Sequence, residues 1–125
     1  MGLVLLDSSV LIALLNPTDF HHKSALNSRT QNDRFIISSI SITELMPRAI
    51  KDGIADGIWN ALNVVAKEIV DVDSEMALGA ARIRALTGAR TPDAIISATA
   101  QALGAELWTF DAKLAKATPG ARLLA

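Results

Sequence analysis

The chain alternates short, continuously apolar segments with longer segments that have the pattern of a helix. A strand that is apolar on both faces must be covered on both sides, which is typical of a parallel sheet flanked by helices. The segments interpreted in this way as strands are 3–6, 35–37, 68–72, 106–109 and 122–124. We therefore expect an α/β fold of three layers, α/β/α, in which a mostly parallel sheet of about five strands has its first strand at the centre.

Helices are predicted between these strands from apolar periodicity and from the residues that begin or end helices. Asn16-Pro17 ends the first of them, Thr91-Pro92 begins another, and Gly88 and Gly104 each follow a helical segment. The predicted helices are 10–15, 19–28, one that starts near 41, 55–67, 74–87, 92–103 and 112–116. A chain of 125 residues has room for one core, so we expect a single domain over residues 1–125.

The charge balance argues against a protein that holds nucleic acid by bulk positive charge, because 12 Lys and Arg face 13 Asp and Glu. The lack of cysteine excludes disulfides and thiolate metal sites. The apolar N-terminal segment has no basic residue before Lys23 and is interrupted by Asp7, so we interpret it as part of the folded protein. No apolar run is long enough to span a membrane, and we expect a soluble, cytoplasmic protein.

Four acidic residues lie where the predicted strands end or the following helices begin. Asp7 and Asp111 follow strands, Glu44 lies one turn into a helix, and Asp93 begins another helix. The carboxyl ends of parallel strands meet at one edge of a sheet, so we expect these four side chains to share one crevice. Carboxylates brought together repel one another unless divalent cations lie among them, and such oxygen ligands suit Mg²⁺ or Mn²⁺.

Each acid also has a local explanation. Asp7 and Asp111 could cap the helices that follow them, and Asp93 could favour the positive end of its helix. Ser41 and Glu44 have the spacing of a capping box. Capping does not require all four to fall at the same end of the sheet, and that coincidence favours a shared site.

Four stretches in this order resemble the PIN domain, a family of metal-dependent nucleases, and most closely its VapC toxins. The stretches are VLLDSSVL at 4–11, SITEL at 41–45, TPDAII at 91–96 and LWTFD at 107–111. The resemblance implies that Asp7, Glu44, Asp93 and Asp111 are the catalytic and metal-binding acids, with the hydroxyls of Ser9 and Thr109 near the metal. It also implies Mg²⁺- or Mn²⁺-dependent hydrolysis of RNA, a homodimer, and an antitoxin protein as partner. One departure is that residues 112–114 read AKL, whereas many members carry an aromatic residue or a further acid there.

Basic residues beside the predicted crevice are candidates for contacts with RNA phosphates. Arg90 precedes Asp93, while Lys113 and Lys116 follow Asp111. The neighbouring His21 and His22 point about 100° apart on a helix, which does not suit a two-histidine metal site. Arg82 and Arg84 diverge by about 200° and cannot hold one phosphate together.

The central part of the chain carries more large apolar residues than two short helices need to cover a sheet. They are Met46, Ile50, Ile54, Ile58, Trp59 and Leu62. We expect a groove among them that takes an amphipathic segment of the antitoxin, with Met46, Ile50, Trp59 and Leu62 in contact. The alternative is that all of them belong to the core.

Three other functions fit parts of the pattern. A receiver domain of a signalling relay has a similar length and would use Asp73, after the third strand, as its phosphoryl acceptor. A phosphatase of the haloacid dehalogenase type would need an acid where Ser9 stands. A PIN-like module that only binds RNA or protein would not need all four acids.

Overall fold

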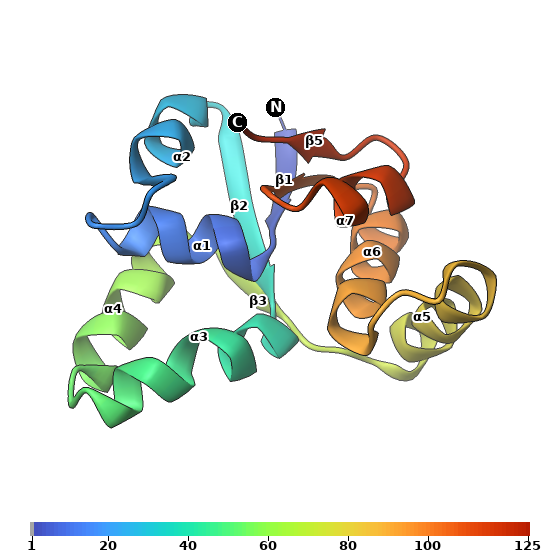
Figure 1. Ribbon diagram of the computed structural model, residues 1–125, viewed down its shortest axis with the longest axis horizontal. Helices are drawn as coiled ribbons and strands as arrows, with labels where there is room; N and C mark the ends of the chain where they lie inside the picture. The colour runs from blue at the N-terminus through green and yellow to red at the C-terminus, as the bar shows by residue number, and fades with distance from the viewer. Residues whose placement is uncertain (1) are drawn as a thin grey trace.

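The computed structural model describes residues 2–125 as a five-stranded sheet between two layers of helices (Figure 1). The strands are β1 (Gly2–Leu6), β2 (Asp33–Ser38), β3 (Glu68–Val70), β4 (Glu106–Thr109) and β5 (Arg122–Leu123). They lie in the order β3-β2-β1-β4-β5, and every neighbouring pair is parallel. The predicted α/β class, the five parallel strands and the central first strand are confirmed.

Seven helices connect and cover the strands within the described residues. They are α1 (Ser8–Leu15), α2 (His22–Ser28), α3 (Ser39–Lys51), α4 (Ala55–Val65), α5 (Ser74–Thr87), α6 (Thr91–Leu103) and α7 (Ala112–Ala117). Helices α1 to α4 lie on one side of the sheet, and α5 to α7 lie on the other (Figure 1). None of the helices in residues 2–125 combines the length and apolar character needed to cross a lipid bilayer.

The core explains why the strands have no polar alternation. On β1, Leu6 packs with Leu11 of α1 and Leu62 of α4, while the adjacent Leu5 packs with Ile96 of α6 on the opposite face. Both faces of the sheet are therefore covered by apolar side chains and shielded from water. Full burial of each such side chain contributes roughly 1.5–3 kcal/mol, so polar residues inside these strands would be costly.

The strand order places a crevice at one defined point. The order reverses direction between β1 and β4, and in open α/β sheets ligands bind beyond the carboxyl ends of strands at such a reversal. Asp7 follows β1 and Asp111 follows β4 after a single intervening residue. The sheet order also differs from the 2-1-3-4-5 order of receiver domains, so the topology removes that alternative.

Some predicted boundaries are wrong. Helix α3 begins at Ser39, and its cap is Ser38, whose hydroxyl accepts from the amide of Ile40 at 3.2 Å. Ser41 is buried inside the first turn, so the predicted capping box with Glu44 does not form. Strand β2 passes directly into α3 without a loop, so no turn residues mark the start of the helix in the sequence.

Two further differences affect the helices on the same side. Helix α2 begins at His22 rather than at 19, because Asp19 and its neighbours form hydrogen-bonded turns. Helix α4 ends at Val65 rather than at 67, since the amide of Lys67 donates to the carbonyl of Phe35 at 2.7 Å. In both places backbone hydrogen bonds outside the helix determine where the helix begins or ends.

Candidate active site

Asp7 is a buried carboxylate whose hydrogen-bond donors are all neutral. Its side chain is 5 % exposed and caps α1 by accepting from the amide of Val10 at 3.0 Å. The hydroxyls of Ser9, at 2.6 Å, and of Thr109 also donate to it. Burial raises the pKa of Asp7, and these hydrogen bonds lower it in part. Asp7 therefore caps α1, and this role does not exclude a functional one for the same carboxylate.

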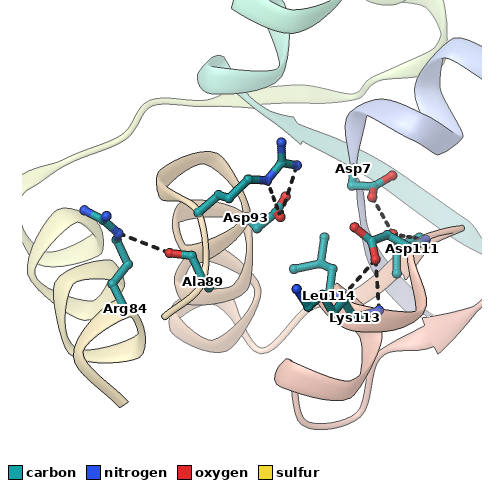
Figure 2. Close-up of polar contacts among 9 residues, drawn as sticks. Asp7, Arg84, Ala89, Asp93, Asp111, Lys113 and Leu114 are labelled. Atoms are coloured by element: carbon teal, nitrogen blue, oxygen red, sulfur yellow. Dashed lines mark hydrogen bonds and ion pairs between the residues drawn. The ribbon is translucent and has the colours of Figure 1, made fainter. Parts of the chain in front are cut away.

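Thr109 connects this carboxylate to the second acid. Its buried hydroxyl donates to Oδ2 of Asp7 and accepts from the amide of Asp111 at 2.9 Å. The Ser9 hydroxyl in turn accepts from the amide of Phe110 at 3.3 Å. The segment after β1 and the segment after β4 are thus tied together (Figure 2). The two hydroxyl residues that the resemblance placed near the metal both donate to Asp7.

Asp111 and Asp93 line one cavity of about 540 Å³. Asp111 caps α7 by accepting from the amides of Lys113 at 2.9 Å and Leu114 at 3.4 Å. Asp93, at the start of α6, forms an ion pair with Arg90 at 3.3 Å (Figure 2). The walls of this cavity are the end of α5, the loop between α5 and α6, the first part of α6, and the segment after β4 with α7.

Glu44 lies elsewhere. Its side chain is exposed and lines a different cavity, of about 610 Å³, between α1 and α3. Within residues 2–125, no three Asp, Glu or His side chains are arranged so that they could hold one metal ion. The expectation that all four carboxyl groups meet in one crevice is therefore wrong, because Glu44 lines a different cavity from Asp93 and Asp111. The strand ends fix the positions of the backbones, whereas the directions of exposed side chains were not predictable from the strand order.

The chemistry of the donors still fits a divalent cation. The groups around Asp7 are carboxylate and hydroxyl oxygens, the hard ligands that Mg²⁺ and Mn²⁺ prefer. A buried carboxylate with only neutral donors is costly, and a nearby cation would remove that cost. Asp7 is thus the residue whose surroundings most favour a bound ion.

Basic side chains lie on the same cavity as Asp93 and Asp111. Arg90, Lys113 and Lys116 all contribute to its lining, as the sequence predicted for residues beside the site. The loop that carries Arg90 is held by Arg84, whose Nε donates to the carbonyl of Ala89 at 3.1 Å (Figure 2). Arg82 lines a separate cavity between α5 and α6, so Arg82 and Arg84 have different surroundings.

An aromatic contact beside the acids was not predicted. The ring of His21 stacks on Phe110, with centroids 4.1 Å apart and planes 16° apart. Nδ1 of His22 instead lies 2.6 Å from the carbonyl oxygen of Ala13, so the two histidines face different partners, as expected. The only sequence signal for the stack was Phe110 itself, between Thr109 and Asp111, because nothing local links it to the loop before α2.

The comparisons with known proteins identify the family of the chain. The family model of the PIN domain matches residues 4–118 of the chain. The chain belongs to the PIN domain family. The chain is also similar to a solved toxin–antitoxin complex from Klebsiella pneumoniae, with 29% identity, 95% of each chain covered and a TM-score of 0.79. No curated protein has significant similarity to the chain.

Two further structures share the PIN fold. FitAcB from Neisseria gonorrhoeae has 21% identity, 96% coverage of both chains and a TM-score of 0.78. The sarcin-ricin loop cleaving toxin VapC20 of Mycobacterium tuberculosis has 17% identity, with 91% of this chain and 94% of that chain covered and a TM-score of 0.73. The resemblance to PIN domains and to VapC toxins that the motifs indicated is confirmed at the level of family and fold.

The predicted partner surface of this PIN domain is only partly exposed. Leu62 is fully buried, so its assignment to a partner contact is wrong, and it belongs to the core. Met46 packs against the same core cluster. Ile50 and Trp59 are 64% and 42% exposed, and Ile54 lies beside them in the chain with half of its surface exposed. The spacing of apolar residues did not distinguish the core face of these helices from the outer face.

Proposed function

We propose that this PIN domain, over residues 1–125, is a metal-dependent endoribonuclease toxin that acts in the cytoplasm. The observation that carries the proposal is the link from buried Asp7 through Thr109 to Asp111 at the reversal of the sheet. The adjoining cavity combines acidic side chains, which can bind a metal ion, with basic side chains, which can bind phosphates. Hydrolysis of an RNA phosphodiester requires both kinds of group. VapC20, the similar toxin that cleaves the sarcin-ricin loop, supports the same class of reaction.

In this proposal Asp7, Asp93 and Asp111 would hold Mg²⁺ or Mn²⁺ once their side chains turn toward one another, because residues 2–125 do not already present three acids around one point. Glu44 would be the fourth catalytic acid. When bound, such an ion polarises a phosphoryl oxygen and lowers the pKa of bound water so that hydroxide is available near neutral pH. Ser9 and Thr109 fix the orientation of the Asp7 carboxylate, since each donates a hydrogen bond to a different oxygen of it. Exposed Glu44 is free to change its direction when RNA or metal is present.

Arg90 and Lys113 bind RNA phosphates. Arg90 is largely exposed, and it forms an ion pair with Asp93 three residues later. An exposed ion pair of this kind contributes little to the free energy of unfolding. A phosphate can therefore attract the guanidinium away and leave Asp93 free to bind the ion. The exchange replaces one ion pair by two favourable contacts and ties substrate binding to completion of the metal site.

An antitoxin protein is the proposed partner, and the toxin forms a homodimer. Several similar solved structures are toxin–antitoxin complexes. Ile50, Ile54 and Trp59 form the exposed apolar part of α3, α4 and their connection, which suits an amphipathic segment. A basic side chain from that segment would inhibit by pairing with the carboxylates and competing with the ion.

The test is cleavage of RNA by the purified, antitoxin-free protein. Total cellular RNA and transfer RNA are incubated with Mg²⁺, with Mn²⁺ or with EDTA, and new ends are mapped by sequencing. We expect defined cuts with either ion and none with EDTA. Binding of RNA without cuts, by a folded protein in either ion, would contradict the proposal and favour a PIN-like module that only binds.

A further inference from the structure

We propose that Phe20, His21 and Phe110 form an aromatic platform that stacks an unpaired nucleobase of the RNA. This inference rests on the proposed function, because it assigns the substrate's position at the same site. His21 stacks on Phe110, and the ring of Phe20 meets His21 edge-on, with centroids 4.9 Å apart and planes 78° apart. Two neighbouring rings of the loop before α2 and one ring after β4 thus form one continuous cluster.

The platform adjoins the acids directly. Phe110 lies between Thr109, which donates to Asp7, and Asp111, which lines the cavity with the cations. The amide of Phe110 donates to the Ser9 hydroxyl, which in turn donates to Asp7. A nucleotide whose phosphate lies among these acids would therefore have its base, or a neighbouring base, within reach of the aromatic rings.

Phe20 is held open to solvent by an ordered loop. Its side chain is 94% exposed, which is unfavourable for a large apolar ring. Asp19 accepts from the amide of His21 at 2.9 Å, and Asn16 accepts from the amide of Thr18 at 3.1 Å. His22 adds the contact with the carbonyl of Ala13. The loop therefore fixes a ring in water instead of letting it fold onto the core.

The distribution of aromatic residues favours a base as the occupant. The chain has three Phe, two Trp and no Tyr, and two of the three Phe lie in this cluster. Phe35 and Trp108 pack against each other in the core. Aromatic side chains stack on any base by its flat face, and cations beside them bind the phosphates. Paired bases are already stacked inside a duplex, so the platform selects single-stranded segments or loops.

The experiment measures stacking without relying on cleavage. A single-stranded RNA that carries one 2-aminopurine is titrated with the protein in Ca²⁺ in place of Mg²⁺, and the RNA is checked for integrity on a gel. Wild type, Phe20→Ala, Phe20→Trp and the control Leu86→Ala are compared. Leu86 is a matched control because its apolar side chain is 87% exposed on α5, away from the cluster.

We expect wild type to quench 2-aminopurine, and Phe20→Ala to lose the quench and bind about tenfold more weakly. Phe20→Trp should retain both, Leu86→Ala should behave as wild type, and binding to duplex RNA should be the same for all four. Equal quenching and affinity for wild type and Phe20→Ala would overturn the platform. So would unchanged RNA binding with loss of antitoxin binding, which would assign Phe20 to the protein partner. Failure of RNA cleavage in Mg²⁺ leaves this measurement intact, so the two proposals fail separately.

Discussion

The hydroxyl of Thr109 donates a hydrogen bond to Oδ2 of Asp7, although the two residues are 102 positions apart in the chain. Both are buried, and the same hydroxyl accepts from the amide of Asp111. One polar atom therefore fixes the carboxylate after β1 relative to the helix after β4. In a sheet whose order reverses between these strands, this atom sets the geometry of the site.

Replacing Thr109 with Val should weaken both stability and activity. Val has nearly the same shape, but it leaves the Asp111 amide and an oxygen of Asp7 without their partner, at a cost of about 1–3 kcal/mol in the free energy of unfolding. Thr109→Ser keeps the hydroxyl and should cost less, about 0.5–1.5 kcal/mol for the lost methyl group. Urea denaturation of the three proteins measures both differences. A Val variant as stable and active as the Ser variant would contradict the linking role.

Asp7→Asn should stabilise the metal-free protein at neutral pH. Because burial raises the pKa of Asp7, the folded state binds its proton more tightly than the unfolded state does. The contribution of Asp7 to the free energy of unfolding therefore falls as pH rises from about 4, the unfolded pKa, through the raised pKa. Asn can still accept from Ser9 and Val10 and can donate to the Thr109 hydroxyl, so we expect Tm to rise by about 2–5 °C.

Thermal melts in EDTA from acidic to neutral pH test this expectation. The advantage of the Asn variant should shrink as pH falls toward about 4, because below this unfolded pKa the wild-type carboxyl becomes protonated in both states. Added Mg²⁺ should then raise the Tm of wild type more than that of the variant, since a ligand stabilises the form that binds it. A wild type that is more stable than the variant in EDTA at neutral pH would show that the ionised Asp7 carboxylate does not destabilise the folded protein.

Arg90→Gln and Lys113→Gln should each reduce the salt dependence of RNA binding. Each phosphate contact to single-stranded nucleic acid contributes about 0.7 to the slope of log affinity against log salt concentration. Both residues line the acidic cavity, whereas Arg82 lies on another one and serves as the matched control in Arg82→Gln. Binding titrations at several salt concentrations give the slopes. Equal slopes for all three variants would remove Arg90 and Lys113 from the RNA contacts.

Trp59→Ala and Leu62→Ala should separate antitoxin binding from folding. Leu62 is fully buried, so its truncation should cost about 2–5 kcal/mol of stability. Trp59 is partly exposed, and its truncation should weaken capture of the antitoxin with a smaller loss of stability. Co-expression with the neighbouring reading frame, a pull-down and a melt for each variant give the comparison. Undiminished capture by Trp59→Ala and Ile50→Ala would exclude this face as the binding surface.

The sequence was sufficient for the fold class and for the positions of the strands, because burial on both faces leaves a direct pattern in each strand. Leu5 and Leu6 point to opposite layers, and both are apolar for that reason. Glycines at positive φ, such as Gly88 and Gly104, ended α5 and α6 where expected. Boundaries failed where backbone pairing replaced a helical turn, as at Lys67.

The candidate site was predictable in position and less so in detail. The end of β1 and the end of β4 place Asp7 and Asp111 together, and the backbone alone decides this. The direction of Glu44, the pairing of Asp93 with Arg90 and the stack of His21 on Phe110 depend on side-chain torsions and on contacts between distant segments. No local pattern encodes such contacts.

The most direct measurement compares RNA cleavage in Mg²⁺ by wild type, Asp93→Asn and Asp73→Asn. Asp73 caps α5 through the amide of Met76 at 2.9 Å, and Asn is an equally good cap, so Asp73→Asn changes an acid outside the site without loss of the fold. We predict that Asp93→Asn loses cleavage by at least about 100-fold while its melt is unchanged, and that Asp73→Asn cleaves as wild type. Cleavage by Asp93→Asn at the rate of wild type, at the same mapped positions, would contradict the assignment of this edge of the sheet as the active site.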